Sequence, residues 1–174
     1  SCKAAWEHKL GRGELPWHLI LGRLQSPLMT NRDKKNNLRI INRAIRCDPS
    51  STCRLCGKGE DRLSHLQHCP AVQEIFEGFE DPPSPTLIYL GLLDDLTPLT
   101  GADSLLYTQL WKQLLIAYTR TQTCNEPYTC LTKGRIVQES LRRTVNKLTA
   151  HEEELTRVVI RHQSRGETIP KHVL

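Results

Sequence analysis

The sequence lacks any hydrophobic run long enough to cross a membrane. It contains no stretch of about 18 apolar residues and no basic segment followed by an apolar stretch and a small-residue cleavage site. We therefore expect a soluble, intracellular protein, nuclear or cytoplasmic, that has no membrane partner. The chain begins with Ser1 and its only methionine is Met29, so we expect it to be a piece of a longer protein.

The signatures of several enzyme classes are also missing. There is no glycine-rich loop of the type that cradles phosphates. His151 and Glu153 have the spacing that begins a deaminase signature, but no Pro-Cys-x-x-Cys follows them. Asp94 and Asp95 are adjacent, like paired metal-binding aspartates, but the aromatic residue of the polymerase motif is absent. We expect this chain to have no catalytic residues and not to be an enzyme by itself.

Charge is distributed unevenly along the chain. Residues 31–62 contain nine Lys and Arg against four acidic residues, whereas residues 63–111 contain seven acidic residues and no Lys or Arg. Residues 133–165 are basic again, with eight Lys and Arg against four Glu. Lys and Arg bind polyanions by displacing the counterions condensed on phosphates, so this separation predicts a basic face. The alternative is that the acidic and basic segments pair with each other in the fold.

Hydrophobic periodicity predicts a mainly α fold. Apolar residues at helical spacing predict helices near residues 15–24, 33–45, 101–122 and on both sides of Pro70, and residues 86–93 also favour a helix. We expect Leu38, Ile41 and Ile45 to line the buried face of the second helix. Trp111 lies on a broad apolar surface of the 101–122 helix, so we expect it in the core rather than in a binding site.

A long C-terminal helix is predicted over residues 135–162, after a loop at 123–134. Its apolar residues lie at positions 137, 141, 145, 148, 155 and 159, which form a heptad-like seam interrupted by Glu152. This helix could pack on the rest of the domain, pair with a second copy of itself, or lie along a partner. We expect residues 1–125 to form a helical domain and residues 126–174 to form a loop, the long helix and a tail.

Residues 47–70 contain a group of cysteine and histidine residues with metal-binding spacing. Cys53 and Cys56 form a Cys-x-x-Cys pair, and the glycines at positions 57 and 59 allow the positive φ angles that such a turn needs. His65 and Cys69 are four residues apart and would share one face of a helix. The spacing Cys-x2-Cys-x8-His-x3-Cys predicts a structural zinc knuckle, because four protein ligands leave no open position for a reactive water.

Alternatives to this ligand set remain. His68 competes with His65 for the fourth position, although it would point about 100° away from Cys69 around a helix. Cys47 is a weaker substitute ligand. Iron could replace zinc, or the segment could bind no metal.

The segment "RIINRAIRCDPSSTCRLCGKGEDRLSHLQHCPAVQEIF" resembles the zinc-binding (CCHC) region downstream of the polymerase domain in non-LTR, LINE-like retrotransposon reverse transcriptases. The shared features are a basic helix, a Cys-x-x-Cys-Gly knuckle, an acidic pair, His-Leu and Cys-Pro. "PLMTN" and "LLYTQLWKQLLIAYTR" are similar to flanking parts of that region, so the resemblance covers roughly residues 15–120. In the family, four residues usually separate the histidine from the last cysteine, whereas three separate them here.

The resemblance implies an accessory module that binds RNA or DNA and is not catalytic, with a reverse transcriptase domain preceding it in the full-length protein. Together with the charge distribution it predicts phosphate contacts by Lys34, Lys35, Arg39, Arg43, Arg46, Arg54 and Arg62. One alternative is a zinc-braced module for protein interaction, in which residues 135–162 bind a partner or self-associate. Another is a degenerate remnant of a retroelement.

Overall fold

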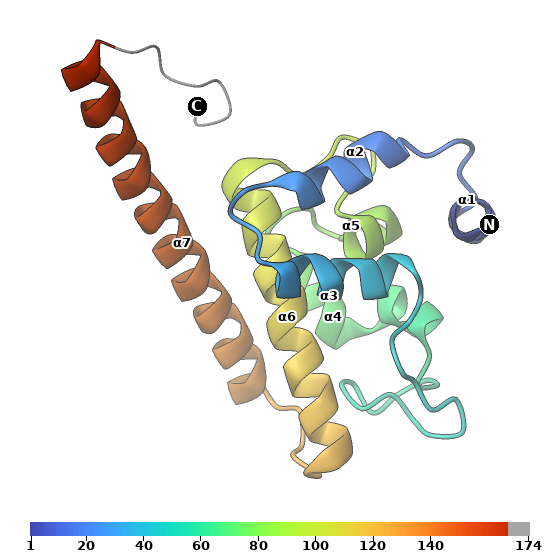
Figure 1. Ribbon diagram of the computed structural model, residues 1–174. Coiled ribbons are helices and arrows are strands. Elements are labelled where there is room, and N and C mark those ends of the chain that lie inside the picture. The colour runs from blue at the N-terminus through green and yellow to red at the C-terminus, as the bar shows by residue number, and fades with distance from the viewer. Residues whose placement is uncertain (167–174) are drawn as a thin grey trace.

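The chain folds into helices connected by turns and loops, as the computed structural model shows for residues 1–166 (Figure 1). The described residues form no β-strand, so the predicted mainly α fold is confirmed. None of their helices has the length and apolar character of a membrane span. The α-helices are α1 (Cys2–Leu10), α2 (Trp17–Gly22), α3 (Asn31–Ile41), α4 (Pro70–Phe76), α5 (Pro85–Leu90), α6 (Gly101–Thr123) and α7 (Cys130–Arg165), with 3-10 helices η1 (Arg23–Gln25) and η2 (Leu63–His68).

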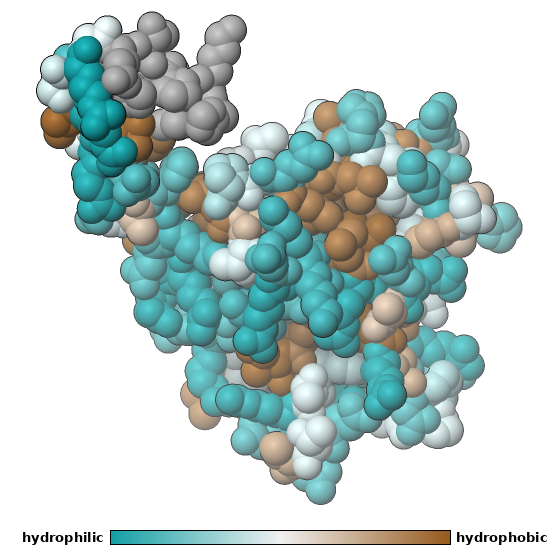
Figure 2. Space-filling model, viewed as in Figure 1, coloured by the Kyte–Doolittle hydropathy of each residue, from teal (hydrophilic) through white to brown (hydrophobic). Residues whose placement is uncertain are grey.

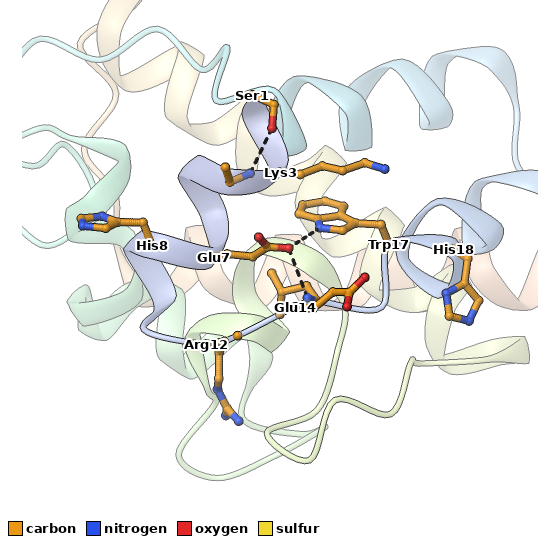
Figure 3. A pocket seen from close by; sticks show the side chains of 11 residues that line it. Ser1, Lys3, Glu7, His8, Arg12, Glu14, Trp17 and His18 are labelled. Carbon is orange, nitrogen blue, oxygen red and sulfur yellow. Dashed lines mark hydrogen bonds between the residues drawn. The ribbon is translucent and has the colours of Figure 1, made fainter.

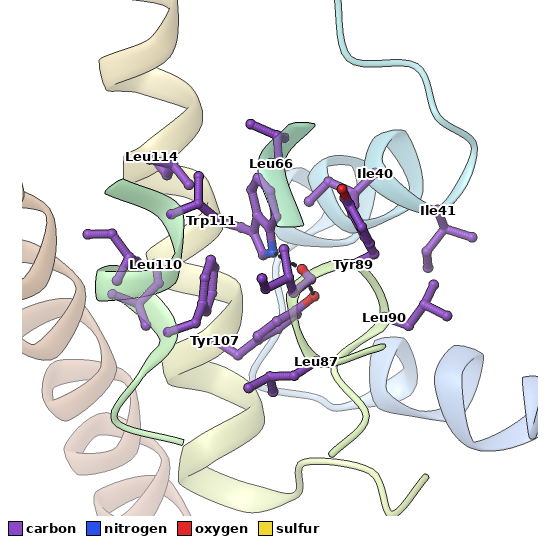
Figure 4. Close-up of a cluster of buried hydrophobic side chains, with 14 of the residues drawn as sticks. Ile40, Ile41, Leu66, Leu87, Tyr89, Leu90, Tyr107, Leu110, Trp111 and Leu114 are labelled. Carbon is purple, nitrogen blue, oxygen red and sulfur yellow. Dashed lines mark hydrogen bonds between the residues drawn. The ribbon is translucent and has the colours of Figure 1, made fainter. Parts of the chain in front are cut away.

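Helix α6 forms the centre of the hydrophobic core (Figure 4). Trp111 is only 1% exposed, which confirms its predicted place in the core. The indole Nε1 of Trp111 and the hydroxyl of Tyr107 both donate to the carbonyl oxygen of Ile88, at 2.8 and 2.9 Å. These two bonds satisfy buried polar groups and hold α5 against α6.

Helix α3 differs from its prediction in both length and orientation. It ends at Ile41 because Arg43 adopts a left-handed conformation, with φ of 56°. Leu38, predicted to be buried, is 39% exposed. The buried positions of the helix are instead Asp33, Asn37, Ile40 and Ile41. The prediction was wrong here because it counted apolar residues only, whereas two polar side chains of this helix lie in the interior.

The N-terminal helices are attached to this core by two tryptophans. The Nε1 of Trp6 donates to the carbonyl oxygen of Ile41 at 2.6 Å, and its ring packs on Tyr89 with the ring centroids 5.0 Å apart. Glu7 of α1 accepts a hydrogen bond from the Nε1 of Trp17 in α2, at 3.1 Å (Figure 3). Helices α1 and α2 are thereby fixed to each other as well as to α3 and α5.

Helices α6 and α7 run antiparallel and pack side by side near the loop between them (Figure 1). The buried positions of α7 are Ile136, Ser140 and Thr144. Two residues of the predicted heptad-like seam, Leu141 and Val145, are 45% and 57% exposed. These two positions of the seam therefore do not pack on α6, whereas Val137, at the start of the seam, packs against the core. The later part of α7 extends beyond the body of the protein (Figure 1).

The predicted and observed limits of the C-terminal region also differ. The helix is longer than predicted and the preceding loop is shorter, because the helix already begins at Cys130. The predicted division between residues 1–125 and 126–174 falls in that loop and stays a prediction. Residues 167–174 of the predicted tail lie outside the described part of the chain.

A fully buried carboxylate connects three helices. Asp33 of α3 accepts a hydrogen bond from the ammonium of Lys147 in α7 at 2.9 Å, and Lys112 of α6 lies 3.8 Å from its other oxygen. Burial opposes the charged form of Asp33, but the hydrogen bonds from Lys147 and Thr30 outweigh this effect and lower its pKa. This ionic cluster helps to hold α7 against the body.

We expect Asp33→Asn to lower the free energy of unfolding by about 1–3 kcal/mol, because buried donors lose a charged acceptor. Since the pKa of Asp33 is lowered in the folded state, its contribution is complete above the ordinary value of about 3.9 and is lost as the pH falls through the folded value. Urea unfolding of both proteins at pH 7 and at successively lower pH should show the difference shrinking in acid. The exposed Glu77→Gln is the control; an equal loss in both variants would contradict the prediction.

Candidate metal centre

The loop that carries the first two cysteines is closed by backbone hydrogen bonds. The amide of Cys53 donates to the carbonyl of Gly59 at 3.0 Å, and the amide of Gly57 donates to that of Cys53 at 2.9 Å. Gly57 and Gly59 have φ angles of 68° and 70°, as the sequence predicted. The turn therefore presents the thiols of Cys53 and Cys56 from a short, tightly held stretch of backbone.

Four potential ligand atoms meet at one point. The ligand atoms of Cys53, Cys56, His65 and Cys69 all lie within 4.8 Å of one another, so the group could hold a metal ion. The Sγ atoms of Cys53 and Cys69 are 3.9 Å apart, and the Sγ of Cys56 is 3.3 Å from the Nε2 of His65. A tetrahedral ion with metal–sulfur bonds of about 2.3 Å requires sulfur atoms roughly 3.8 Å apart. The geometry therefore fits a four-coordinate site.

The second ligand pair converges for a different reason from the one predicted. His65 lies in the 3-10 helix η2, and Cys69 is the residue between η2 and α4, so the two do not share one face of an α-helix. His65 nevertheless joins the cysteines, whereas His68 is exposed and its Nε2 lies 2.9 Å from the side-chain nitrogen of Gln67. Cys47 also lies outside the group.

Gly59 is the residue that allows the imidazole of His65 to approach the knuckle. A Cβ atom at this position would lie 2.9 Å from both the Nδ1 and the Cε1 of His65, which is closer than real contacts allow. The positive φ angle of Gly59 would in addition strain any L-residue there. The spacing in the sequence predicted the backbone conformation of Gly59 but not its contact with the imidazole of His65.

The ionisation of the two buried thiols also favours a cation. Cys53 and Cys69 are 2% and 0% exposed. Their mutual hydrogen bond lowers the pKa of Cys53, while that bond and burial raise the pKa of Cys69. Two thiolates this close repel each other in a medium of low dielectric constant. A metal ion between them would stabilise both thiolates and displace their protons.

A buried carboxylate attaches the knuckle to α6. Asp61, 2% exposed, accepts hydrogen bonds from the backbone amide of Asp48 at 2.9 Å and from the hydroxyl of Tyr118 in α6. The guanidinium of Arg54 lies 3.1 Å from Asp61 and stacks over the ring of Tyr118 at 4.6 Å. This arrangement fixes the orientation of the knuckle, and nothing in the sequence pattern distinguished Asp61 from its exposed neighbour Glu60.

The predicted phosphate-binding residues fall into two groups. Most are exposed, namely Lys35, Arg39, Arg43, Arg46 and Arg62, and Lys34 is half-buried. Arg62 pairs with the exposed carboxylate of Glu60, whereas the guanidinium of Arg54 is held inside the fold by Asp61 and Tyr118. We therefore assign Arg54 to the attachment of the knuckle and not to a surface for phosphates.

Comparison with known proteins does not assign the chain to a family. No protein-family model matches the chain, and no curated protein or solved structure gives a match.

We expect the purified chain to bind one metal ion and His65→Ala to weaken that binding, while His68→Ala leaves it unchanged. Loss of a supporting residue outside the ligand set of a metal site typically lowers affinity about 10- to 100-fold, so loss of a ligand should cost at least that much. Native mass spectrometry identifies the ion and its stoichiometry, and competition with a chelator gives the affinity. Equal effects of the two substitutions would contradict the assignment of His65.

Proposed function

We propose that this chain is a nucleic-acid-binding module braced by one structural zinc ion. Three thiols and one imidazole form a soft and borderline donor set that suits zinc. All four positions of a tetrahedral site are filled by protein atoms, which favours a structural role over a catalytic one. The observation that carries the proposal is the convergence of Cys53, Cys56, His65 and Cys69 beside a basic, exposed surface.

The basic surface lies on α3 and the segment that follows it. Since Asp33, Asn37 and Ile40 face inward, Arg32, Lys35 and Arg39 are exposed on the outward side of the helix. Figure 2 shows hydrophilic side chains over much of this face of the molecule, and a hydrophobic patch towards α2.

Positive charge also reaches the neighbouring α1. Burial and the nearby charge of Arg43 both lower the pKa of Lys9. The like charges of Lys9 and Arg43 therefore lie close enough to repel each other. Such a local excess of positive charge attracts phosphates.

Ion pairs with the acidic segment 63–111 do not compensate the positive charge of segment 31–62 among the described residues. Two acidic residues of the segment 63–111 form ion pairs, Glu74 with Lys133 and Asp94 with Arg12, and neither pair involves the basic segment 31–62. Of the acids in the basic segment itself, Asp61 pairs with Arg54 and Glu60 pairs with Arg62. Among residues 1–166, the ion pairs therefore do not join the acidic segment to the basic segment 31–62, although the pair of Glu74 with Lys133 joins it to the second basic segment, 133–165.

The resemblance of the knuckle supports a narrower form of the proposal. In this form the chain is the accessory, non-catalytic module of a non-LTR retrotransposon reverse transcriptase-like protein and lies downstream of a polymerase domain. RNA or DNA would be held by the outward face of α3 and by Arg46 and Arg62 near the knuckle. A degenerate remnant of such an element would retain the fold and the zinc site but not the binding.

We expect the double substitution Lys35→Glu and Arg39→Glu to weaken binding to a single-stranded RNA or DNA oligonucleotide at least about tenfold at low salt. Each lost phosphate contact should also reduce the slope of log K against log salt by about 0.7. Fluorescence anisotropy at several salt concentrations measures both quantities. Arg157→Glu with Arg161→Glu, two exposed arginines of α7, makes the same charge change as a control. Unchanged affinity of the α3 variant would contradict the proposal.

A second candidate function, self-association through α7, is favoured by the exposure of its apolar seam. Leu141 and Val145 of the seam are 45% and 57% exposed, and Ile160, which follows the last seam position, is 59% exposed. The helix is about 54 Å long at 1.5 Å per residue, and its later part extends beyond the body (Figure 1). A second copy of the helix would bury this stripe.

If α7 self-associates, we expect the chain to be dimeric at tens of micromolar, and Leu141→Glu with Val145→Glu to make it monomeric, because two charges would be buried in the interface. Light scattering coupled to gel filtration measures the mass. Leu131→Glu, a change at a 77% exposed leucine in the first turn of α7, is the matched control. A monomeric wild-type chain would exclude this candidate.

A further inference from the structure

A groove between α6 and α7 is lined by apolar and basic side chains that take no part in the knuckle. It has a volume of about 520 Å³ and lies where the C-terminal part of α6 faces the N-terminal part of α7, close to their connecting loop. Ile116 and Ala117 of α6 and Ile136 of α7 contribute apolar surface to it. This volume and this apolar lining would accommodate one flat organic group.

The same groove is lined by four arginines. Arg142 and Arg143 both pair with the carboxylate of Glu139, at 2.5 and 2.8 Å. Arg120 of α6 and Arg135 of α7 are exposed and form no ion pair with any described residue. Including Glu126 of the loop, two glutamates oppose four arginines, which leaves an excess of positive charge. Arg120 and Arg135 are therefore available to an anion.

A donor without a partner also borders the groove. The side-chain nitrogen of Gln113 is buried and has no hydrogen-bond partner among the described residues. A buried donor without an acceptor is unfavourable. Because Gln113 lines the groove, a ligand bound there would lie near this donor.

We propose that this groove binds one nucleotide of a single-stranded nucleic acid, with the phosphate between Arg120 and Arg135 and the base against the apolar surface of Ile116. The inference rests on the proposed nucleic-acid function and specifies the strand state that the module prefers. Unpaired bases can unstack from their neighbours, turn outward and pack on apolar or guanidinium surfaces of a protein. In a duplex the bases are paired and stacked, so only phosphates could reach the groove.

The test uses the full chain, a fluorescent single-stranded 20-mer and the corresponding duplex. We expect Arg120→Ala with Arg135→Ala to weaken single-strand binding about tenfold and to reduce the salt slope by roughly 1.4. Ile116→Ala should weaken single-strand binding and leave the salt slope and duplex binding unchanged, because it removes only an apolar contact. Arg157→Ala with Arg161→Ala is the control, with the same loss of charge on the exposed later part of α7. Circular dichroism confirms that each variant is folded.

The outcomes separate this inference from the proposed function. If the α3 charge-reversal variant loses binding while the Arg120 and Arg135 variant binds like wild type, the groove inference is overturned and the proposed function stands. If the groove variant alone loses binding, the groove inference stands and the role of the α3 face is overturned. An equal loss for duplex and single strand, or equally tight binding of polyglutamate, would also overturn it, since neither needs an unpaired base.

Discussion

The convergence of four side chains at one point is the constraint on which the knuckle depends. The turn between Ser51 and Arg62 contributes little apolar surface apart from Leu55 and Cys53, which are 6% and 2% exposed. So few buried groups cannot offset the conformational entropy of an ordered loop. A bound ion would contribute much of the folding free energy of this segment. Gly59 lies beside the imidazole of His65, where the Cβ atom of a larger residue would collide with the ring.

Two buried carboxylates attach the knuckle, α3 and α7 to α6. Asp61 attaches the knuckle to Tyr118 of α6, and Asp33 attaches both α3 and α7 to the same helix through Lys112 and Lys147. Each carboxylate has a cationic partner, without which its burial would be strongly unfavourable. The orientation of the basic helix α3 relative to the knuckle follows from these two attachments. A basic surface on both α3 and the knuckle is therefore a property of the whole fold and not of either segment alone.

Local chemistry made the group of three cysteines and one histidine and most of the helices predictable, whereas the packing between helices could not be predicted in this way. The spacing of Cys53 and Cys56 implies a particular turn, and Trp111 lies in an apolar surface that can only be buried. By contrast, α3 turns Asp33 inward and α7 packs through Ser140 and Thr144, although more apolar residues were available on both helices. These polar side chains are buried because they have partners that are distant in the sequence, as Asp33 has in Lys147. A pattern that counts only apolar residues cannot detect such partners.

The inward orientation of these polar residues also explains the surface of the protein. When Ser140 and Thr144 face α6, the larger Leu141 and Val145 necessarily face outward, since successive residues of a helix lie about 100° apart. The same rotation of α7 brings Arg135, Arg142 and Arg143 to the edge of the groove, opposite Arg120 of α6. A rotation that buried the heptad-like seam would move these arginines away from α6. The exposed apolar stripe and the arginine-lined groove therefore have the same cause, which is that α7 packs on α6 through the face that carries Ser140 and Thr144.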